Sequence, residues 1–292
     1  KTYVQAHPKN KWILGRGWDA ARWGLGSAPT AADLDGVTGN IPAFLLSGDG
    51  ELGWVNSAAL RAAGLTKVTG PLTPTHVAQL RRLAPQPSAR DRDAAFAKAQ
   101  RTLIANGITT VSDMGMTVND WQSYRRAGDR GALLMRIIGY ADGVEQMVAI
   151  AGPEPTPWLY DDRLRMIGIS FSLDGTGNAR TAWMKQAATG LPRIASTPLR
   201  NQMSRAAMDG FQIALAAHGD GAVDEALAAF AEMSATYSGD RRWRIDGIEA
   251  IQPDYDAQFL SGHVTPVLGK DQTTQPSLLP LIRNPLVAAG SF

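Results

Sequence analysis

The sequence predicts an α/β protein built as a (β/α) barrel, and three observations carry this prediction. Helical and apolar segments alternate from residue 88 onward in units the size of a strand–helix–strand repeat. Several expected strands are apolar on both faces, which is typical of a parallel sheet covered by helices. The length of 292 residues suits one barrel domain. An open doubly wound sheet is the alternative, and its dinucleotide-binding form is disfavoured because no GxGxxG motif follows a strand.

The elements follow from apolar periodicity and from the residues that cap or break helices. The first barrel helix is expected from Ser88, a good N-cap, to Asn106, which precedes a glycine. Further helices are expected at 119–127, 197–209, 223–234, 253–262 and 278–289. Strands are expected at 108–111, 132–140, 164–173, 211–217, 243–251 and 263–268. We expect one barrel domain over 1–292, with 1–87 as an irregular N-terminal part that packs on it.

Composition excludes several classes of function. Lys and Arg number 29 against 27 Asp and Glu, and this near balance argues against a nucleic-acid or anionic-membrane partner. No apolar run is long enough to cross a membrane, so a soluble protein of a bacterial-type cytoplasm or periplasm is expected. The chain begins at Lys1 without an apolar signal core, which favours a processed product or a segment of a longer protein. The oligomeric state stays open.

Cysteine and histidine usage bounds the chemistry. The absence of cysteine excludes disulfides, thiolate catalysis and cysteine-based metal sites. The four histidines are His7, His76, His218 and His263. A histidine-rich metal centre would therefore need nearly all of them.

Six segments, taken in order, carry a family resemblance. They are WILGRGWD (12–19), DGELGWVNSAAL (49–60), GITTVSDMG (107–115), LRMIGISFSLDGTGNAR (164–180), GFQIALAAHGD (210–220) and RWRIDGIEAIQP (242–253). Together they resemble the amidohydrolase superfamily, specifically the amidohydrolase-3 group that includes N-substituted formamide deformylases. The resemblance implies a TIM-like barrel with a small β-sandwich. It also implies hydrolysis of C–N bonds by hydroxide that zinc or another divalent metal activates.

The metal ligands of the family have no counterparts at the matching positions. The lysine of the family's fourth strand falls at Ser170, the histidine of the fifth at Ala216, and that of the sixth at Gly247. Two further positions that are usually histidine in the family are Glu51 and Ser112. A divalent metal needs three or more convergent protein ligands, so the resemblance predicts a lost metal site and no bound cofactor.

The remaining differences concern the chain's ends and its loops. The family's first-strand His-x-His would precede Lys1, and its eighth-strand aspartate would follow Phe292. The segments 186–190 and 269–278 are shorter than in the family. We therefore expect an incomplete or rebuilt barrel without the β-sandwich, a degenerate or engineered scaffold that lacks the parental activity. Residues 12–19 or 42–50 would then replace the first strand, or the barrel would be open.

His218 is the leading candidate for surviving chemistry. It lies two positions after Ala216, so strand alternation puts both on the same face. With Asp220 beside it and Ser170 or Ser172 one strand away, an acid–base or nucleophilic site is one hypothesis. The alternative is a structural histidine that bonds to the backbone or an aspartate. The serines lack the final glycine of a GxSxG elbow.

The carboxylates divide between chemistry and structure. Asp174 and Asp220 follow strands and would serve either the site or the caps of the next helices. Asp113 is a candidate base or a turn residue. Asp246 and Glu249 are three apart on one expected strand, so only one of them faces a site, and Asp246 is assigned to the pocket.

The N-terminal part supplies two further pocket candidates. Asp49 and Glu51 would form an acid–base pair in an extended segment, but the surrounding glycines favour a turn. Trp54 is expected to line a pocket or the core. The function hypotheses are thus an inactive barrel, a hydrolase that uses His218 and nearby carboxylates, or a module that binds a small molecule at the barrel mouth.

Overall fold

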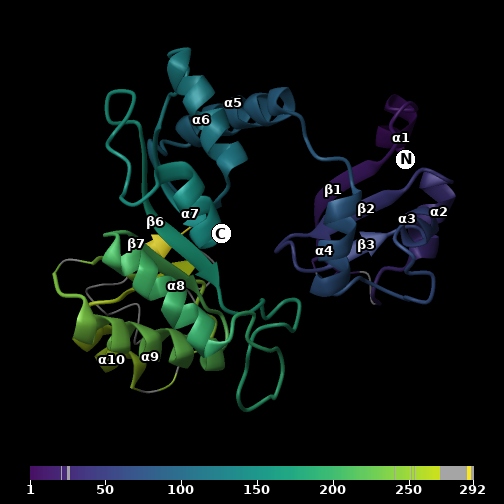
Figure 1. Cartoon of the computed structure of the whole chain (residues 1–292). Coiled ribbons are helices and arrows are strands. Elements are labelled where there is room, and N and C mark those ends of the chain that lie inside the picture. Colours follow the sequence, from purple (N-terminus) through teal and green to yellow (C-terminus); the bar gives the residue numbers. More distant parts are fainter. Residues whose placement is uncertain are drawn as a thin grey trace. The chain divides into compact units, whose positions relative to one another are not determined.

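The computed structural model describes residues 1–20, 22–24, 27–239, 241–250, 252, 254–269 and 288–290. The chain divides into two compact units, Lys1–Gln86 and Pro87–Phe292, and each is described by itself. Both units combine helices with a sheet (Figure 1).

The N-terminal unit is built on a sheet of three strands. Its elements are α1 (Thr2–Ala6), β1 (Ile13–Trp18), α2 (Ala31–Thr38), β2 (Ala43–Ser47), β3 (Gly53–Val55), α3 (Ser57–Ala62) and α4 (Pro74–Leu83). The strand order is β1-β2-β3, with β1 parallel and β3 antiparallel to β2. Strands β1 and β2, which lie within 12–19 and 42–50, thus pair with each other and with β3. That these residues replace the first strand of the barrel stays a prediction. The packing of residues 1–87 on the barrel stays a prediction.

The C-terminal unit alternates strands with helices. Its elements are α5 (Ala89–Ala105), β4 (Thr110–Met116), α6 (Val118–Asp129), β5 (Arg136–Asp142), α7 (Gly143–Ala151), β6 (Leu164–Ser172), α8 (Ser196–Met208), β7 (Gln212–Ala216), α9 (Asp220–Thr236), β8 (Arg244–Asp246), α10 (Tyr255–Gly262), β9 (Thr265–Gly269) and β10 (Ala288–Gly290). The sheet has seven strands in the order β10-β9-β8-β7-β6-β5-β4, and every neighbouring pair is parallel. The predicted α/β fold with a helix-covered parallel sheet is confirmed, and this half-barrel fits a TIM-like barrel.

Local sequence signals explain where the helices begin. Ser88 caps α5 as predicted, and its hydroxyl and the Asp91 carboxylate form a capping box. Helix α6 is capped by Thr117 rather than Asn119, because Thr117 and Asp120 form a second capping box two residues earlier.

Three elements differ from the sequence prediction. Strand β8 covers only 244–246, because the backbone leaves the extended region at Gly247, where φ is +79°. Helix α7 was not predicted, and it follows β5 directly. The helix expected at 278–289 lies mostly outside the described residues. Its last two residues, Ala288 and Ala289, belong to strand β10 instead.

The sheet has one face packed against helices. Ile169, Phe171 and Ile213 belong to a buried cluster with side chains of α8 and α9. Helices α8, α9 and α10 lie together beside strands β6 and β7 (Figure 1). Because side chains alternate along a strand, Ser170 and Ser172 lie on the opposite face of β6. That opposite face carries the polar residues considered below.

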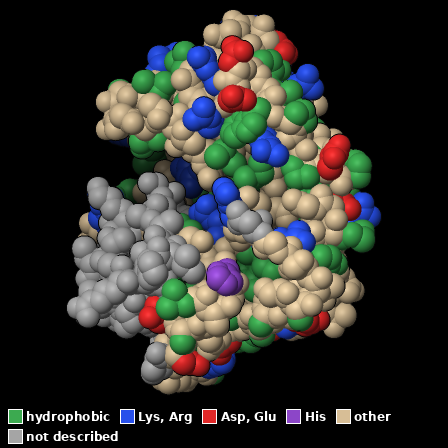
Figure 2. Space-filling model, turned by 90° about the vertical axis from the view of Figure 1, so that its left-hand side faces the viewer, with side chains coloured by type: hydrophobic (Ala, Val, Ile, Leu, Met, Phe, Trp, Pro, Cys, Tyr) green, Lys and Arg blue, Asp and Glu red, His purple; other side chains and the backbone are tan. Residues whose placement is uncertain are grey.

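Charged side chains are mixed on the molecular surface. On the face drawn in Figure 2, Lys and Arg side chains lie among Asp, Glu and hydrophobic side chains, and no one kind covers the face. This distribution follows the near balance of 29 basic and 27 acidic residues. Within the described part of the chain, no helix is long and apolar enough to cross a membrane.

Candidate functional site

The three positions at which the resemblance places metal ligands come together on adjacent strands. These positions are 170, 216 and 247. Ala216 of β7 stands in register with Ser172 of β6 and with Asp246 of β8, so these three residues form one row of the sheet. Ser170 shares the face of Ser172, and Gly247 follows Asp246. Because these strands are parallel, the three ligand positions meet near one edge, at the carboxyl ends of the strands.

His218 fills the space beside Gly247. Its Nδ1 atom lies 3.3 Å from Oδ1 of Asp174. Its Nε2 atom lies 2.7 Å from the position that a Cβ on Gly247 would take, closer than real Cβ contacts come. Glycine at 247 therefore leaves room for the His218 ring in its present position and adopts the positive φ of 79° without strain.

Asp174 is a fully buried carboxylate that organises this edge of the sheet. It accepts hydrogen bonds from the backbone N–H groups of His218 at 3.0 Å, Gly219 at 2.9 Å and Trp183 at 2.9 Å. Gly219 is the N-cap of α9. Asp174 thus joins the end of β6 to the start of α9 and orients the His218 ring, so it serves both the backbone and the site.

The two serines of β6 are engaged elsewhere. The hydroxyl of Ser170 accepts a hydrogen bond from the backbone N–H of Gly115 at 2.9 Å. The hydroxyl of Ser172 accepts one from Arg193 at 3.0 Å and donates one to the carbonyl of Asp174 at 3.1 Å. Among the described residues, no hydrogen bond joins either hydroxyl to the histidine ring. The structure therefore does not form the serine–histidine pair of the nucleophilic hypothesis.

Asp246, which the sequence assigned to a pocket, instead lies in a polar network on the same face of the sheet, and sequence reasoning missed its partners. Arg244 donates two hydrogen bonds to Oδ1 of buried Asp246, at 2.8 and 2.6 Å. Burial raises the pKa of Asp246, although the charges of Arg244 and His218 oppose the shift. The Arg244 guanidinium lies over the ring of Tyr140, with 5.9 Å between Cζ and the ring centroid. The hydroxyl of Tyr140 donates a hydrogen bond to Oε1 of Gln212 at 2.6 Å. Asp246 is thus paired with an arginine, and its carboxylate is not a free base.

Asp142 is a second residue that sequence reasoning missed. It ends β5 and stands in register with Ser170 of β6. Partial burial raises the pKa of its carboxyl group. No side-chain hydrogen bond of Asp142 to another described residue caps the helix that follows. The available signal was its position directly after an apolar run, which it shares with Asp174.

Asp113 lies away from this cluster. Its carboxylate accepts a hydrogen bond from the hydroxyl of Tyr124 on α6, at 2.8 Å. Asp113 pairs with Gly139 of β5, and Gly139 pairs with Met166 of β6, so the three residues lie in one row across the sheet. Met166 belongs to the buried cluster between the sheet and the helices. Burial raises the pKa of Asp113. The predicted candidate base therefore faces the helices rather than the edge that carries His218.

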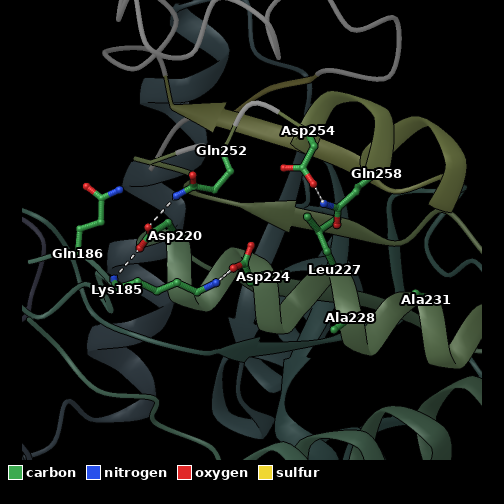
Figure 3. Close-up of a pocket in the computed structure, with 10 residues that line it drawn as sticks. All are labelled: Lys185, Gln186, Asp220, Asp224, Leu227, Ala228, Ala231, Gln252, Asp254 and Gln258. Carbon is green, nitrogen blue, oxygen red and sulfur yellow. Dashed lines mark hydrogen bonds and ion pairs between the residues drawn. The ribbon is translucent and has the colours of Figure 1, made fainter. Parts of the chain in front are cut away.

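Asp220 belongs to a separate cleft. Its carboxylate accepts hydrogen bonds from the backbone N–H of Lys185 at 2.8 Å and from the amide of Gln252 at 2.9 Å. Figure 3 shows these contacts and the ion pair between Lys185 and Asp224 in a cleft of about 640 Å³. Asp220 thus anchors the loop before α8 to α9 and does not bond to the imidazole of His218.

Glu51 and Trp54 lie in the N-terminal unit. Gly50 has a φ of +78°, and the N–H of Glu51 donates to the Asp49 carboxylate at 3.1 Å. The turn predicted for 49–51 is confirmed. Trp54 donates its indole N–H to the carbonyl of Thr30 at 2.7 Å, which ties β3 to the segment before α2.

The residues at this edge do not fit a divalent metal. Among the residues that the structure describes, no group of three or more His, Cys, Asp or Glu could hold a metal ion. The three positions that would supply ligands carry a hydroxyl, a methyl group and a hydrogen, and His218 occupies the space beside Gly247. The described residues at this edge therefore do not supply the three or more ligands that a divalent metal needs.

A smaller pocket adjoins the His218 segment. It has a volume of about 370 Å³ and is lined by Gly177, Arg180, Ala182, Met184, Thr189, Glu249 and Ala250. The N–H of Glu249 donates to the carbonyl of His218 at 2.9 Å, so the pocket wall is fixed to the same edge of the sheet.

Comparison with known proteins gives relatives over nearly the whole chain. Protein LONG AFTER FAR-RED 3 from Arabidopsis thaliana is 25% identical over 304 residues, which cover 90% of this chain and 51% of the relative. Exoenzymes regulatory protein AepA from Pectobacterium carotovorum subsp. carotovorum is 45% identical over 65 residues, 22% of this chain and 14% of the relative. This chain thus spans about half the length of the first of these proteins.

Two solved structures share the fold. An uncharacterized metal-dependent hydrolase from Pyrococcus horikoshii superposes with a TM-score of 0.74 at 19% identity, over 97% of this chain and 62% of that one. An uncharacterized metal-dependent hydrolase from Pyrococcus furiosus superposes with a TM-score of 0.72 at 21% identity, over 99% of this chain and 66% of that one. Residues 1–261 also match the profile of the amidohydrolase family. This chain belongs to the amidohydrolase family.

Proposed function

We propose that this chain is an amidohydrolase-type barrel whose metal centre is lost, a degenerate or engineered scaffold related to the N-substituted formamide deformylases. The observation that carries the proposal is the position of His218. Its ring stands where a side chain at 247 would begin, and Asp174 holds it there. A ligand at position 247 and the present His218 orientation exclude each other sterically.

The chemistry of the substituted positions supports the same conclusion. The resemblance implies a lysine at position 170, often carbamylated, and the hydroxyl of Ser170 cannot form such a carbamate. This hydroxyl is also engaged with the backbone N–H of Gly115. Ala216 has no donor atom. The expected ligand positions at the ends of three neighbouring strands thus all carry residues that are not metal ligands. Without a bound metal, no metal-activated hydroxide would form at this edge. We therefore propose that the chain does not catalyse metal-dependent hydrolysis of C–N bonds.

Metal content and turnover test this proposal together. The protein is purified from medium supplemented with zinc and manganese, its metal content is measured by mass spectrometry, and hydrolysis of N-benzylformamide is followed with and without chelator. We expect well below one metal ion per chain and no turnover above the buffer rate. Stoichiometric metal with turnover that the chelator abolishes would refute the proposal. His218→Ala and His263→Asn are measured alongside, to detect metal held loosely by single histidines.

Metal-free hydrolysis is the second candidate function, favoured by the pairing of His218 with Asp174. The buried carboxylate orients the ring through Nδ1, and Nε2 remains as the atom that would take a proton from water. This candidate predicts turnover that is insensitive to chelator and is lost in His218→Ala. The control His263→Asn alters an exposed histidine with φ of +50°, a conformation that asparagine tolerates, and it should leave such turnover unchanged.

A further inference from the structure

The pocket beside the His218 segment combines apolar walls with two charged side chains, one basic and one acidic. Its volume of about 370 Å³ falls within the range of about 300–1,000 Å³ of pockets that bind small molecules. Ala182, Met184 and Ala250 supply apolar surface. Arg180 and Glu249 supply the charged groups.

The walls of this pocket are held by hydrogen bonds. Met184 donates its N–H to the carbonyl of Thr189 at 2.9 Å, which closes a small hairpin in the loop after β6. Across the pocket, the Glu249 carboxylate accepts the N–H of Gly177 at 2.9 Å. A pocket with fixed walls loses less conformational entropy when it takes up a ligand.

The two charged groups differ in how they are used. Glu249 is engaged by the backbone of the loop. The exposed Arg180 guanidinium makes no hydrogen bond, ion pair or ring contact with any residue of the described part of the chain. Arg200, by contrast, is paired with Glu225 at 2.5 Å and Glu232 at 2.7 Å. The Arg180 guanidinium is therefore the charged group of this pocket whose hydrogen-bond donors are not used by other described residues, and they are available to a ligand beside the engaged carboxylate of Glu249.

We propose that this pocket binds a small organic monocarboxylate that carries a compact apolar group, with Arg180 as the carboxylate-binding residue. A guanidinium presents two parallel N–H donors that match the two oxygens of a carboxylate. The apolar walls favour a hydrocarbon group over a strongly hydrated anion such as phosphate. The site goes beyond the proposed function, because binding here requires neither a metal nor turnover.

Ligand-observed fluorine NMR tests the proposal with para-trifluoromethylbenzoate and its neutral amide as matched probes. Each titration is run with chelator and repeated without it. The benzoate should bind at least about tenfold more tightly than the amide, because a charge-assisted hydrogen bond contributes more than a neutral one. Arg180→Gln should weaken benzoate binding by about tenfold or more and leave amide binding unchanged.

Two controls separate this site from general charge effects and from strain. Arg101→Gln removes the same charge from an exposed position on α5 and should leave benzoate binding unchanged. Arg180 has a φ of +56°, so Arg180→Gly removes the guanidinium and also relieves backbone strain. Arg180→Gly should therefore lose benzoate binding in a protein at least as stable as the wild type.

Methionine-methyl NMR locates the bound probe. Met184 lines the pocket, and its signal is assigned with Met184→Leu. Benzoate should shift this signal in the wild type and not in Arg180→Gln. Equal affinity for acid and amide, an unchanged affinity in Arg180→Gln, or an unshifted Met184 signal would each overturn the proposal. Displacement of benzoate by an equal concentration of inorganic phosphate would overturn the choice of ligand class. Benzoate binding that appears only without chelator would overturn it too, and would instead contradict the loss of the metal centre.

Discussion

The Nε2 atom of His218 and the Cα atom of Gly247 are packed so closely that a Cβ on residue 247 would stand 2.7 Å from the ring nitrogen. The same volume cannot hold the imidazole and a side chain at 247. The two residues are therefore coupled, and the identity of one constrains the other. This coupling can be measured as a free energy.

Gly247→Ala should destabilise the C-terminal unit by about 2 kcal/mol or more, of which about 1 kcal/mol comes from the positive φ and the rest from the clash with His218. In a His218→Ala background the clash is gone, and the same substitution should cost only about 1 kcal/mol. Urea unfolding of the four proteins of this double-mutant cycle gives the coupling energy. Additive effects of the two substitutions would show that the ring does not occupy this volume.

Gly210→Ala is the matched control for the backbone contribution. Its φ of +80° is close to the +79° of Gly247, but an added Cβ would meet no atom within 4 Å. Gly210→Ala should lower the free energy of unfolding by about 1 kcal/mol, both in the wild type and in the His218→Ala background.

Asp174→Asn should destabilise the protein by about 3 kcal/mol and loosen the segment around His218. The amide group keeps one acceptor oxygen, whereas the native carboxylate accepts three backbone N–H groups with its two oxygens. At least one buried donor would lose its partner, and the new NH₂ group would face other donors.

Hydrogen exchange checks this prediction directly. The amide protons of Trp183, His218 and Gly219 should exchange faster in Asp174→Asn than in the wild type. The control Asp162→Asn changes an exposed aspartate whose φ of +60° suits asparagine, and these three protons should exchange there at the native rate. Equal protection in both variants would contradict the role assigned to Asp174.

Asp113→Asn should raise stability at neutral pH. Burial holds the pKa of Asp113 above its ordinary value of 3.8, so the folded state binds the proton more tightly than the unfolded state. The stability that this group contributes is fully present below its unfolded pKa and is lost as pH rises through its folded pKa. Asparagine stays neutral and can still accept the hydrogen bond from Tyr124.

A pH series of urea titrations gives the sign of this effect. The stability difference between Asp113→Asn and the wild type should be small below about pH 3.8, grow as pH rises, and level off above the folded pKa. A difference that shrinks with rising pH would mean that the carboxylate is stabilised by its surroundings rather than penalised.

Local signals along the chain were sufficient for the fold class and for much of the element order. The capping box of Ser88 and Asp91 marks the start of α5 within four residues of sequence. The apolar run at 164–173 identifies β6, which covers 164–172. These features depend on neighbours in the sequence, and composition and periodicity therefore reveal them.

The site could be predicted only in part, because contacts between strands depend on register. The sequence shows that Ser170, Ala216 and Gly247 offer no set of metal ligands. It does not show that Asp142 stands beside Ser170, or that Asp113 faces α6. Pairing between strands arises only in the folded chain, so periodicity alone does not tell which neighbours the carboxylates of Asp113 and Asp142 take.

The sequence by itself thus determined the alternation of strands and helices, the parallel sheet and the residue types at 170, 216 and 247, all of which are properties of single residues or of short segments. Only the tertiary structure decided that His218 occupies the space beside Gly247 and that Asp174 holds it. It also decided that the charge of Arg180 faces a pocket without a partner among the described residues. These relationships join segments tens of residues apart, and they arise when the backbone brings separate loops to one edge of the sheet.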